Sequence, residues 1–267
     1  MRRKILTFNR MLLILSAVVV ALFVLSWFRF SSPSQGNPFE PTASSTPKLK
    51  TPVPSSSPKP TARPTNNPIP SDGSYIIKGV PFTPQAPFGN WSDQRQEDGC
   101  EEASTIMAVR WFRGQSLTLQ QAETEILKIS DYEQEKYGTY HDTSPADTVN
   151  RIFKDYLNYH NVKAVSNISL PDDIKNELRK GYLVLVQVDG QVLQNPYYTP
   201  PGPDRHMLVI TGYDTATQEF ITNDPGTKRG QNYRYSEYQL WEAMRDYPTG
   251  NHLPITEFIR SMIVVMP

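Results

Sequence analysis

Residues 206–224 read HMLVITGYDTATQEFITND, and this stretch decides how the rest of the chain is interpreted. Two extended runs, 206–213 and 219–222, are joined by a polar link of hairpin length, which predicts an antiparallel strand pair. The start of one strand and the end of its antiparallel neighbour lie at the same edge of a sheet. We therefore expect His206 and Asp224 to meet there.

Outward from this hairpin, helical patterns come first and extended runs follow. Further strands are predicted at 182–188 (YLVLVQV) and 262–266 (MIVVM). Apolar spacing and capping residues predict helices over 100–112, over 119–129, after Ser144-Pro145, over 171–180 and over 236–245. This order indicates an α+β fold, with N-terminal helices packed on a C-terminal antiparallel sheet, rather than alternating βαβ units.

Charge and cysteine content exclude several classes of protein. The first 72 of the 267 residues hold nine of the 27 basic and two of the 27 acidic side chains, so residues 73–267 carry 18 and 25, a net charge of −7. Such a domain is not expected to bind nucleic acid, because phosphate binding needs a positive surface. The single cysteine excludes an internal disulfide, a zinc ribbon and an iron–sulfur cluster.

The N-terminal part predicts a membrane anchor. Residues 11–28 carry no charge and are about long enough to cross a ~30 Å hydrocarbon core. Four basic residues precede this run and one follows it, which places residues 1–10 in the cytoplasm and everything after residue 30 outside. We expect an uncleaved transmembrane signal anchor over 11–30. The alternative is a cleaved signal peptide, although the run is long for one and bulky residues follow it.

Two further regions follow the anchor. Residues 31–72 contain 11 prolines among Ser, Thr, Asn and Lys, so we expect a disordered, partly extended linker. Aromatic and aliphatic residues return with clear periods over 73–267, which is long enough for one folded domain. Its histidines show no metal-ligand spacing, and we expect no metal and no other cofactor.

Cys100 is the candidate nucleophile. It follows Gly99 and opens the helix predicted over 100–112, where the unpaired N–H groups of a helix start favour thiolate over thiol. The alternative is a buried, inert thiol, which is common for a lone cysteine. Glu101 and Glu102 are expected to complement the helix dipole and to point away from the sulfur, because nearby carboxylates would raise its pKa.

The order of a cysteine on a helix followed by a His–Asp hairpin resembles the papain-like plan. The motifs that carry the resemblance are VPFTPQAP at 80–87, NW at 90–91, Gln96, GCEEAS at 99–104, DRHMLVITGYD at 204–214 and NDP at 223–225. These motifs look like the bacteriocin-processing (double-glycine leader) peptidase family, and most resemble its stand-alone, membrane-anchored branch. The similarity covers about residues 76–266.

This resemblance implies a papain-like cysteine peptidase fold with Cys100 as nucleophile, His206 as general base and Asp224 as the group that orients it. It also implies a glutamine that completes the oxyanion hole with the Cys100 N–H. Gln85 fits the family signature best, Gln96 second and Gln94 third. The chain has no ATP-binding cassette, so leader trimming during export does not follow from the resemblance.

The sequence therefore predicts a membrane-anchored, extracytoplasmic cysteine peptidase that acts on a peptide or protein substrate. Two alternatives remain open: a non-catalytic peptide-binding domain of the same fold, and a thiol-dependent amidase or acyltransferase acting on cell-wall peptides. Tyr197, Tyr198 and the loop 200–203 are either the frame of a substrate cleft beside His206 or an ordinary surface loop.

Overall fold

The sheet at the centre of the protein is antiparallel throughout. In the computed structural model, which describes residues 73–267, its strand order is β2-β7-β3-β4-β5-β6, and β1 pairs with β4 beside this path. The strands are β1 (Tyr75–Ile76), β2 (Val162–Val165), β3 (Leu183–Val188), β4 (His206–Asp214), β5 (Glu219–Asn223), β6 (Tyr233–Ser236) and β7 (Met262–Val265).

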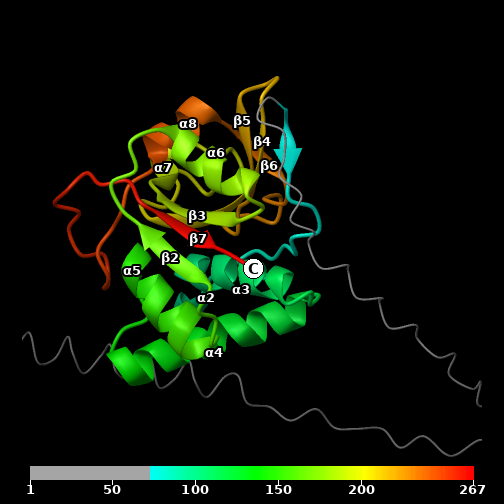
Figure 1. Ribbon diagram of the computed structural model, residues 1–267. Coiled ribbons are helices and arrows are strands. Elements are labelled where there is room, and N and C mark those ends of the chain that lie inside the picture. Colours follow the sequence, from blue (N-terminus) through cyan, green and yellow to red (C-terminus); the bar gives the residue numbers. More distant parts are fainter. Residues whose placement is uncertain (1–72) are drawn as a thin grey trace, which may run out of the picture. The chain divides into compact units, whose positions relative to one another are not determined.

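The two central strands are covered on both faces. All six residues of β3 and eight of the nine residues of β4 are buried. A strand that is buried on both faces has no polar alternation, which explains the near-continuous apolar runs in this part of the sequence. Helices therefore pack on either side of the sheet (Figure 1).

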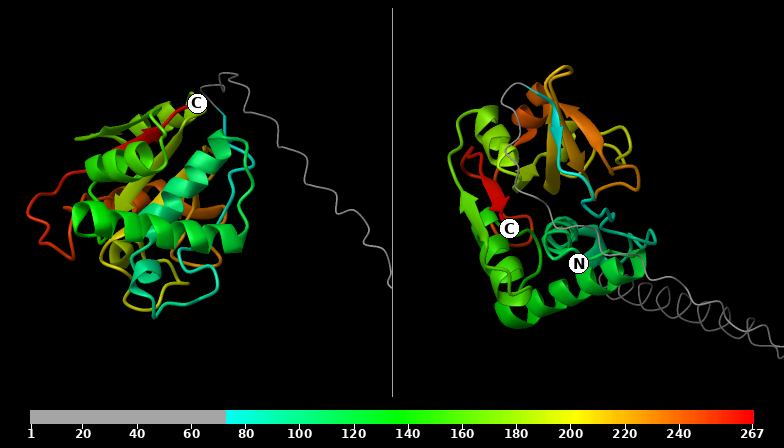
Figure 2. Two further views of the ribbon diagram at one scale, coloured as in Figure 1. Left: turned by 90° about the horizontal axis from the view of Figure 1, so that it is seen from below. Right: turned by 45° about the vertical axis from the view of Figure 1, so that its right-hand side comes forward.

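The helices beneath the sheet in Figure 1 belong mostly to the first half of the domain. They are α2 (Gln94–Glu97), α3 (Cys100–Phe112), α4 (Leu119–Tyr137), α5 (Pro145–Asp147) and the π-helical segment η2 (Thr148–Tyr156). Helix α3 packs directly on β4, and the Ser104 hydroxyl donates to the main-chain oxygen of Met207 at 3.2 Å. Figure 2 shows the chain passing from β1 at the sheet to α2 and α3.

Three helices cover other parts of the sheet. They are α6 (Pro171–Arg179), α7 (Gly190–Leu193) and α8 (Glu237–Ala243), grouped on the side opposite α4 (Figure 1). Helix α6 contacts β3 and β4, whereas α8 contacts β5 and β6. The papain-like α+β architecture predicted from the sequence is confirmed.

Helix α4 is longer than its sequence pattern predicted. It begins as expected with a capping box, in which Thr118 Oγ1 accepts from the Gln121 N–H and Gln121 Oε1 accepts from the Thr118 N–H. It then continues beyond residue 129, and Ser130 and Glu133 are buried on its inner face. These buried polar residues interrupt the apolar period, which made the predicted helix too short.

The predicted membrane anchor lies outside the described residues, as do the cytoplasmic N-terminus (1–10) and the linker (31–72). Within residues 73–267, no helix combines the length and the apolar character that crossing a membrane requires.

Candidate active site

His206 and Asp224 meet at one edge of the sheet, as the hairpin pattern predicted. Strand β4 begins at His206, β5 ends one residue before Asp224, and the pairing of Val209 with Asn223 brings these ends together. His206 Nε2 lies 2.8 Å from Asp224 Oδ1, and both side chains are buried. Because Asp224 occupies Nε2, Nδ1 is the ring nitrogen that remains for proton transfer.

The Asp224 carboxylate is fully buried and is held by several donors besides His206. Oδ1 also accepts from the Gly226 N–H at 2.9 Å. Oδ2 accepts from Asn195 Nδ2 at 3.1 Å, from the Tyr198 hydroxyl at 2.6 Å and from the Tyr235 hydroxyl at 2.5 Å. Burial alone would raise the pKa of Asp224, but His206 and the two hydroxyl groups lower it to about 2. Asp224 is therefore a fixed anion.

Gly226 allows close packing against the imidazole. A Cβ at this position would lie 3.0 Å from His206 Cε1 and 2.8 Å from Tyr198 Cε1. Such distances are shorter than an ordinary carbon contact, so any side chain here would push the ring or the tyrosine aside. The Asp-Pro-Gly turn thus supplies the carboxylate of Asp224 and, through Gly226, leaves room for the His206 imidazole that this carboxylate binds.

Cys100 is the first residue of α3, as predicted, and its side chain is 6 % exposed. Its main-chain N–H has no partner within the helix, because the first N–H groups of a helix point outward. Gly99 allows a close approach here, since a Cβ would lie 2.7 Å from the main-chain oxygen of Arg95 and 3.0 Å from Ile126 Cγ2. The packing of α3 on β4 brings Cys100 to the strand that begins with His206.

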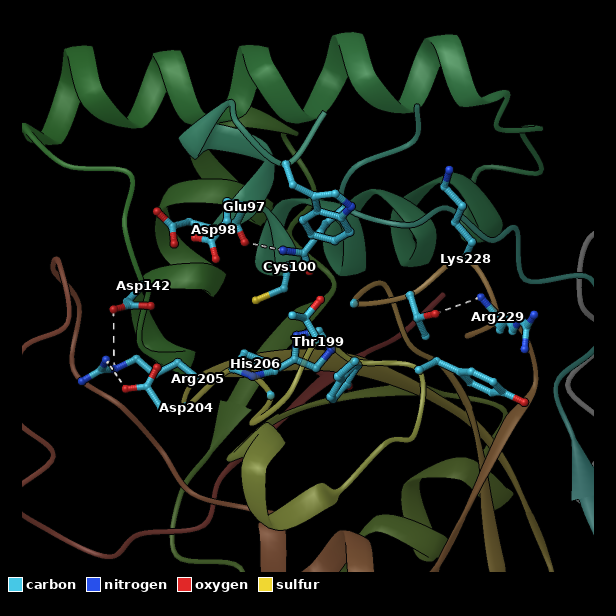
Figure 3. Close-up of a pocket in the computed structure, with 18 of the residues that line it drawn as sticks. Glu97, Asp98, Cys100, Asp142, Thr199, Asp204, Arg205, His206, Lys228 and Arg229 are labelled. Atoms are coloured by element: carbon cyan, nitrogen blue, oxygen red, sulfur yellow. Dashed lines mark hydrogen bonds and ion pairs between the residues drawn. The ribbon is translucent and has the colours of Figure 1, made fainter. Parts of the chain in front are cut away.

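Cys100 and His206 face the same cleft, which has a volume of about 750 Å³ (Figure 3). The aromatic and proline-rich segment before β4 forms part of its wall through Tyr197, Tyr198, Thr199, Gly202 and Pro203. Of the two readings of this segment left open by the sequence, the structure favours the frame of a cleft over an ordinary surface loop.

The two sides of the cleft differ in charge (Figure 3). One side carries four carboxylates and one guanidinium, from Glu97, Asp98, Asp142, Asp204 and Arg205. The other carries Lys228 and Arg229, and neither makes an ion pair with any residue of 73–267. Arg229 lies over the Tyr197 ring, 4.6 Å from its centroid. The cleft therefore presents a negative wall and a positive wall on either side of Cys100 and His206.

Glu101 does not point away from the sulfur, and the sequence expectation was wrong on this point. Cys100 Sγ donates to Glu101 Oε2 at 3.0 Å. Burial raises the pKa of the Cys100 thiol well above its usual value, and the carboxylate of Glu101 raises it further, whereas the Met207 N–H acts in the opposite direction. The general rule for acids in a first helical turn assumes solvent around them, but α3 is buried from its first residue.

Glu102 is also buried, but it makes no hydrogen bond to the sulfur, so it does not contradict the expectation that it points away from Cys100. Its Oε1 accepts from the Ser130 hydroxyl at 2.9 Å, while Oε2 has no hydrogen-bond partner among the described residues. Both carboxylate oxygens of the nearby Glu133 lack a partner in the same part of the chain. Burial, Glu133 and Glu101 raise the pKa of Glu102 well above its usual value, and burial and Glu101 raise that of Glu133 to about 8.

Of the three glutamines considered for an oxyanion hole, only Gln85 reaches the cleft with Cys100. Its Nε2 donates to the main-chain oxygens of Gln96 at 3.1 Å and Glu97 at 2.5 Å. Gln85 would have to release one of these bonds to donate to a reacting carbonyl. The Gln96 side chain is buried outside the cleft lining, and Gln94, also outside it, donates to the carboxylates of Glu97 and Asp98.

Sequence reasoning missed two of the groups that hold Asp224. Asn195 and Tyr235 approach it from the loop before β4 and from β6, and no sequence motif marks either of them. The clustered tyrosines at 197–198 were the one available signal. No group of three or more His, Cys, Asp or Glu within residues 73–267 is arranged to hold a metal ion.

A papain-like fold with a cysteine at a helix start and a His–Asp pair at a sheet edge defines the class of this domain. The model of the peptidase C39-like family matches residues 77–249, and the chain belongs to that family. A crystal structure of a Bacillus anthracis protein assigned as a C39-like peptidase is similar, with a TM-score of 0.45, 14 % identity, and coverage of 73 % of this chain and 99 % of that one. No curated protein is significantly similar to the chain.

Proposed function

We propose that residues 73–267 form a cysteine peptidase that hydrolyses peptide bonds with Cys100, His206 and Asp224. The observation that carries the proposal is the arrangement of the cleft. Cys100 and His206 line it together, and the imidazole is bound through Nε2 to a fully buried carboxylate. Membership of the peptidase C39-like family supports the same reaction class.

The geometry suggests a role for each group. Nδ1 of His206 takes the Cys100 proton, and Sγ forms a bond to the peptide carbonyl carbon. The carbonyl oxygen becomes an oxyanion, which the Cys100 N–H and the Gln85 amide stabilise. His206 then returns its proton to the leaving amine as the C–N bond breaks, which leaves a thioester. A water molecule, deprotonated by the same imidazole, hydrolyses the thioester and restores the thiol.

We further propose that this domain works outside the cytoplasm, tethered by a single membrane anchor. The support is the sequence alone: an uncharged run at 11–28, basic residues mostly before it, and a proline-rich segment at 31–72. Detection of the full-length protein in membranes, with residues 73–267 accessible to protease from outside the cell, would test this.

The catalytic proposal is tested with full-length wild-type protein, Cys100→Ala and Asp224→Asn, each incubated with a peptide library and with cell-wall peptide fragments. We expect the wild type to cleave peptides, Cys100→Ala to be inactive, and Asp224→Asn to lose roughly 10⁴-fold in kcat, because the imidazole loses its orienting anion. Cleavage that survives Cys100→Ala would contradict the proposal.

The same experiment separates the two alternatives. Cleavage confined to cell-wall fragments would identify an amidase that uses the same three groups. Peptide binding without turnover by the wild type, unchanged in Cys100→Ala, would identify a binding domain and overturn the peptidase proposal.

A further inference from the structure

The contact between Cys100 and Glu101 is unusual for a nucleophile. The sulfur donates to Glu101 Oε2 at 3.0 Å, and the carboxylate is only 3 % exposed. An ionised carboxylate at this distance favours the neutral thiol, because two negative charges so close together repel each other strongly in a buried site. The proposed mechanism needs a thiolate, so the state of Glu101 decides whether one forms.

Glu101 is held firmly in this position by groups without charge. Its Oε1 accepts from the Tyr247 hydroxyl at 2.8 Å and from the Thr143 N–H at 3.3 Å. Within residues 73–267 no cation forms an ion pair with Glu101. The second oxygen, Oε2, is thereby directed at the sulfur. The carboxylate therefore accepts the hydrogen bond of the Cys100 thiol.

The charged groups around Glu101 are mostly negative. Glu102 is the next residue of α3, Glu133 comes from α4, and Asp142 comes from the segment before α5. The nearby cations face other carboxylates: Arg205 pairs with Asp142 at 3.5 Å and with Asp204 at 3.0 Å, and Arg151 pairs with Asp147 at 3.3 Å. Burial and Asp142 raise the pKa of Glu101 to about 7, although the Cys100 and Tyr247 hydrogen bonds lower it.

We propose that Glu101 is a further catalytic residue, which holds Cys100 as a neutral thiol when ionised and releases it as a thiolate when protonated. This inference rests on the proposed peptidase function. In the released state one proton from solvent is bound to Oε2 of Glu101, and the thiol proton has moved to Nδ1 of His206. The protein gains one proton in total, and nothing is oxidised or reduced.

The sign of the pH dependence follows from this exchange. At low pH Glu101 is neutral, the sulfur loses its carboxylate acceptor, and the Cys100 thiolate pairs with the imidazolium of His206. As the pH rises through the titration of Glu101, the neutral thiol is restored and the nucleophile becomes less reactive. The reactivity of Cys100 is therefore expected to be higher at mildly acidic pH than at pH 8.

The test uses the full-length chain, because Cys100 is its only cysteine and alkylation reports on this sulfur alone. The rate of labelling by iodoacetamide is measured for wild type and Glu101→Gln at pH 5.5 and pH 8. The glutamine keeps the shape and an oxygen for Tyr247 and Thr143. We expect Glu101→Gln to react about tenfold faster than wild type at pH 8, since one adjacent negative charge is removed, and within about twofold of it at pH 5.5.

Two further variants make the result specific. Glu133→Gln removes a carboxylate from the same buried acidic cluster without contacting the sulfur. We expect it to change the ratio of the labelling rates at pH 5.5 and pH 8 by less than twofold. Tyr247→Phe removes a donor that stabilises ionised Glu101, so the loss of reactivity should move to higher pH. This second variant tests the proposal even if Glu101→Gln does not fold.

Equal rates for wild type and Glu101→Gln at pH 8 would overturn the inference, as would an equal acceleration at both pH values. Peptide hydrolysis is measured in parallel, and it separates the two proposals. If Glu101→Gln alters labelling as expected but the wild type cleaves no peptide, the control of the sulfur by Glu101 stands and the peptidase function fails. If peptides are cleaved with no effect of Glu101→Gln, only the inference fails.

Discussion

Tyr198 donates its hydroxyl to Oδ2 of Asp224 at 2.6 Å, the carboxylate oxygen that His206 does not use. Tyr235 donates to the same oxygen, and both hydroxyl groups are buried with it. The imidazole is therefore bound to a carboxylate whose other oxygen is fixed by two tyrosine hydroxyl groups. Any loss of these hydroxyl groups acts on His206 only through Asp224.

The first prediction concerns Tyr235→Phe. The variant removes the hydroxyl that donates to Asp224 at 2.5 Å and accepts from Asn195 at 2.6 Å. We expect a loss of about 1.5–3 kcal/mol in the free energy of unfolding, the usual range for a hydrogen bond to a charged group. Urea denaturation measures it. Tyr238→Phe is the matched control, because Tyr238 is 76 % exposed, and a similar loss there would contradict the argument.

The second prediction concerns stability against pH. A carboxyl group whose pKa is raised on folding binds more protons in the folded state, so stability falls as pH rises above its unfolded value. Burial and Glu101 raise the pKa of Glu133 to about 8 from a usual value of 4.5. Stability should therefore decline between about pH 4.5 and pH 8. Asp224 has the opposite effect on stability, because its pKa is lowered to about 2. Its contribution to the free energy of unfolding is lost as pH falls towards 2.

Glu133→Gln isolates this effect. We expect the variant to be more stable than the wild type at pH 8 by roughly 1–3 kcal/mol, because both oxygens of the buried carboxylate lack a partner in the described residues. At pH 4.5 the two proteins should unfold at similar urea concentrations. A constant difference across this range would show that charge is not the cause.

The third prediction concerns the charge of the substrate. Lys228 and Arg229 form the positive wall of the cleft and have no ion-pair partner in residues 73–267. Reversing both charges to Glu should raise KM for acidic peptides about tenfold and lower it for basic ones, since charged cleft walls concentrate ligands of opposite sign. Lys163→Glu, on the exposed part of β2, is the control. An unchanged preference in the double variant would exclude a role for these side chains.

The fourth prediction concerns Gly226→Ala. The new methyl group would lie 3.0 Å from His206 Cε1 and 2.8 Å from Tyr198 Cε1. Displacing a catalytic group by about 1 Å costs roughly 10²-fold in rate, so we expect kcat/KM for a cleaved peptide to fall by about that factor. Gly73→Ala, with nothing within 4 Å of the added atom, serves as the control. Full activity in Gly226→Ala would mean that the ring tolerates the methyl group.

The sequence was sufficient for the elements that carry a clear period or a cap. The predicted helix over 100–112 matches α3 residue for residue, and the hairpin placed His206 beside Asp224. The short elements β1, α2, β2, α7 and β6 were not predicted. Each is four residues or fewer, which is too short for a clear period, and the three strands among them depend on pairing with other strands.

Side-chain direction at the site was harder to predict than position. The rule for first-turn acids directed Glu101 away from the sulfur, whereas the packing of α3 buries its carboxylate against Cys100. Two of the groups that hold Asp224, Asn195 and Tyr235, come from separate segments, and only the folded sheet brings them together. Local patterns contain no information about such contacts, because they depend on burial by distant parts of the chain.

The position of β7 has a consequence for how the molecule is made. This strand, Met262–Val265, lies between β2 and β3 and pairs with both of them. While a ribosome is still adding residues before 262, β3 has an open edge and β2 has no neighbour in the sheet. The pairing of β2 with the sheet is thus completed only when residues 262–265 have been added, and their removal would expose an edge of β3 without removing any residue that lines the cleft.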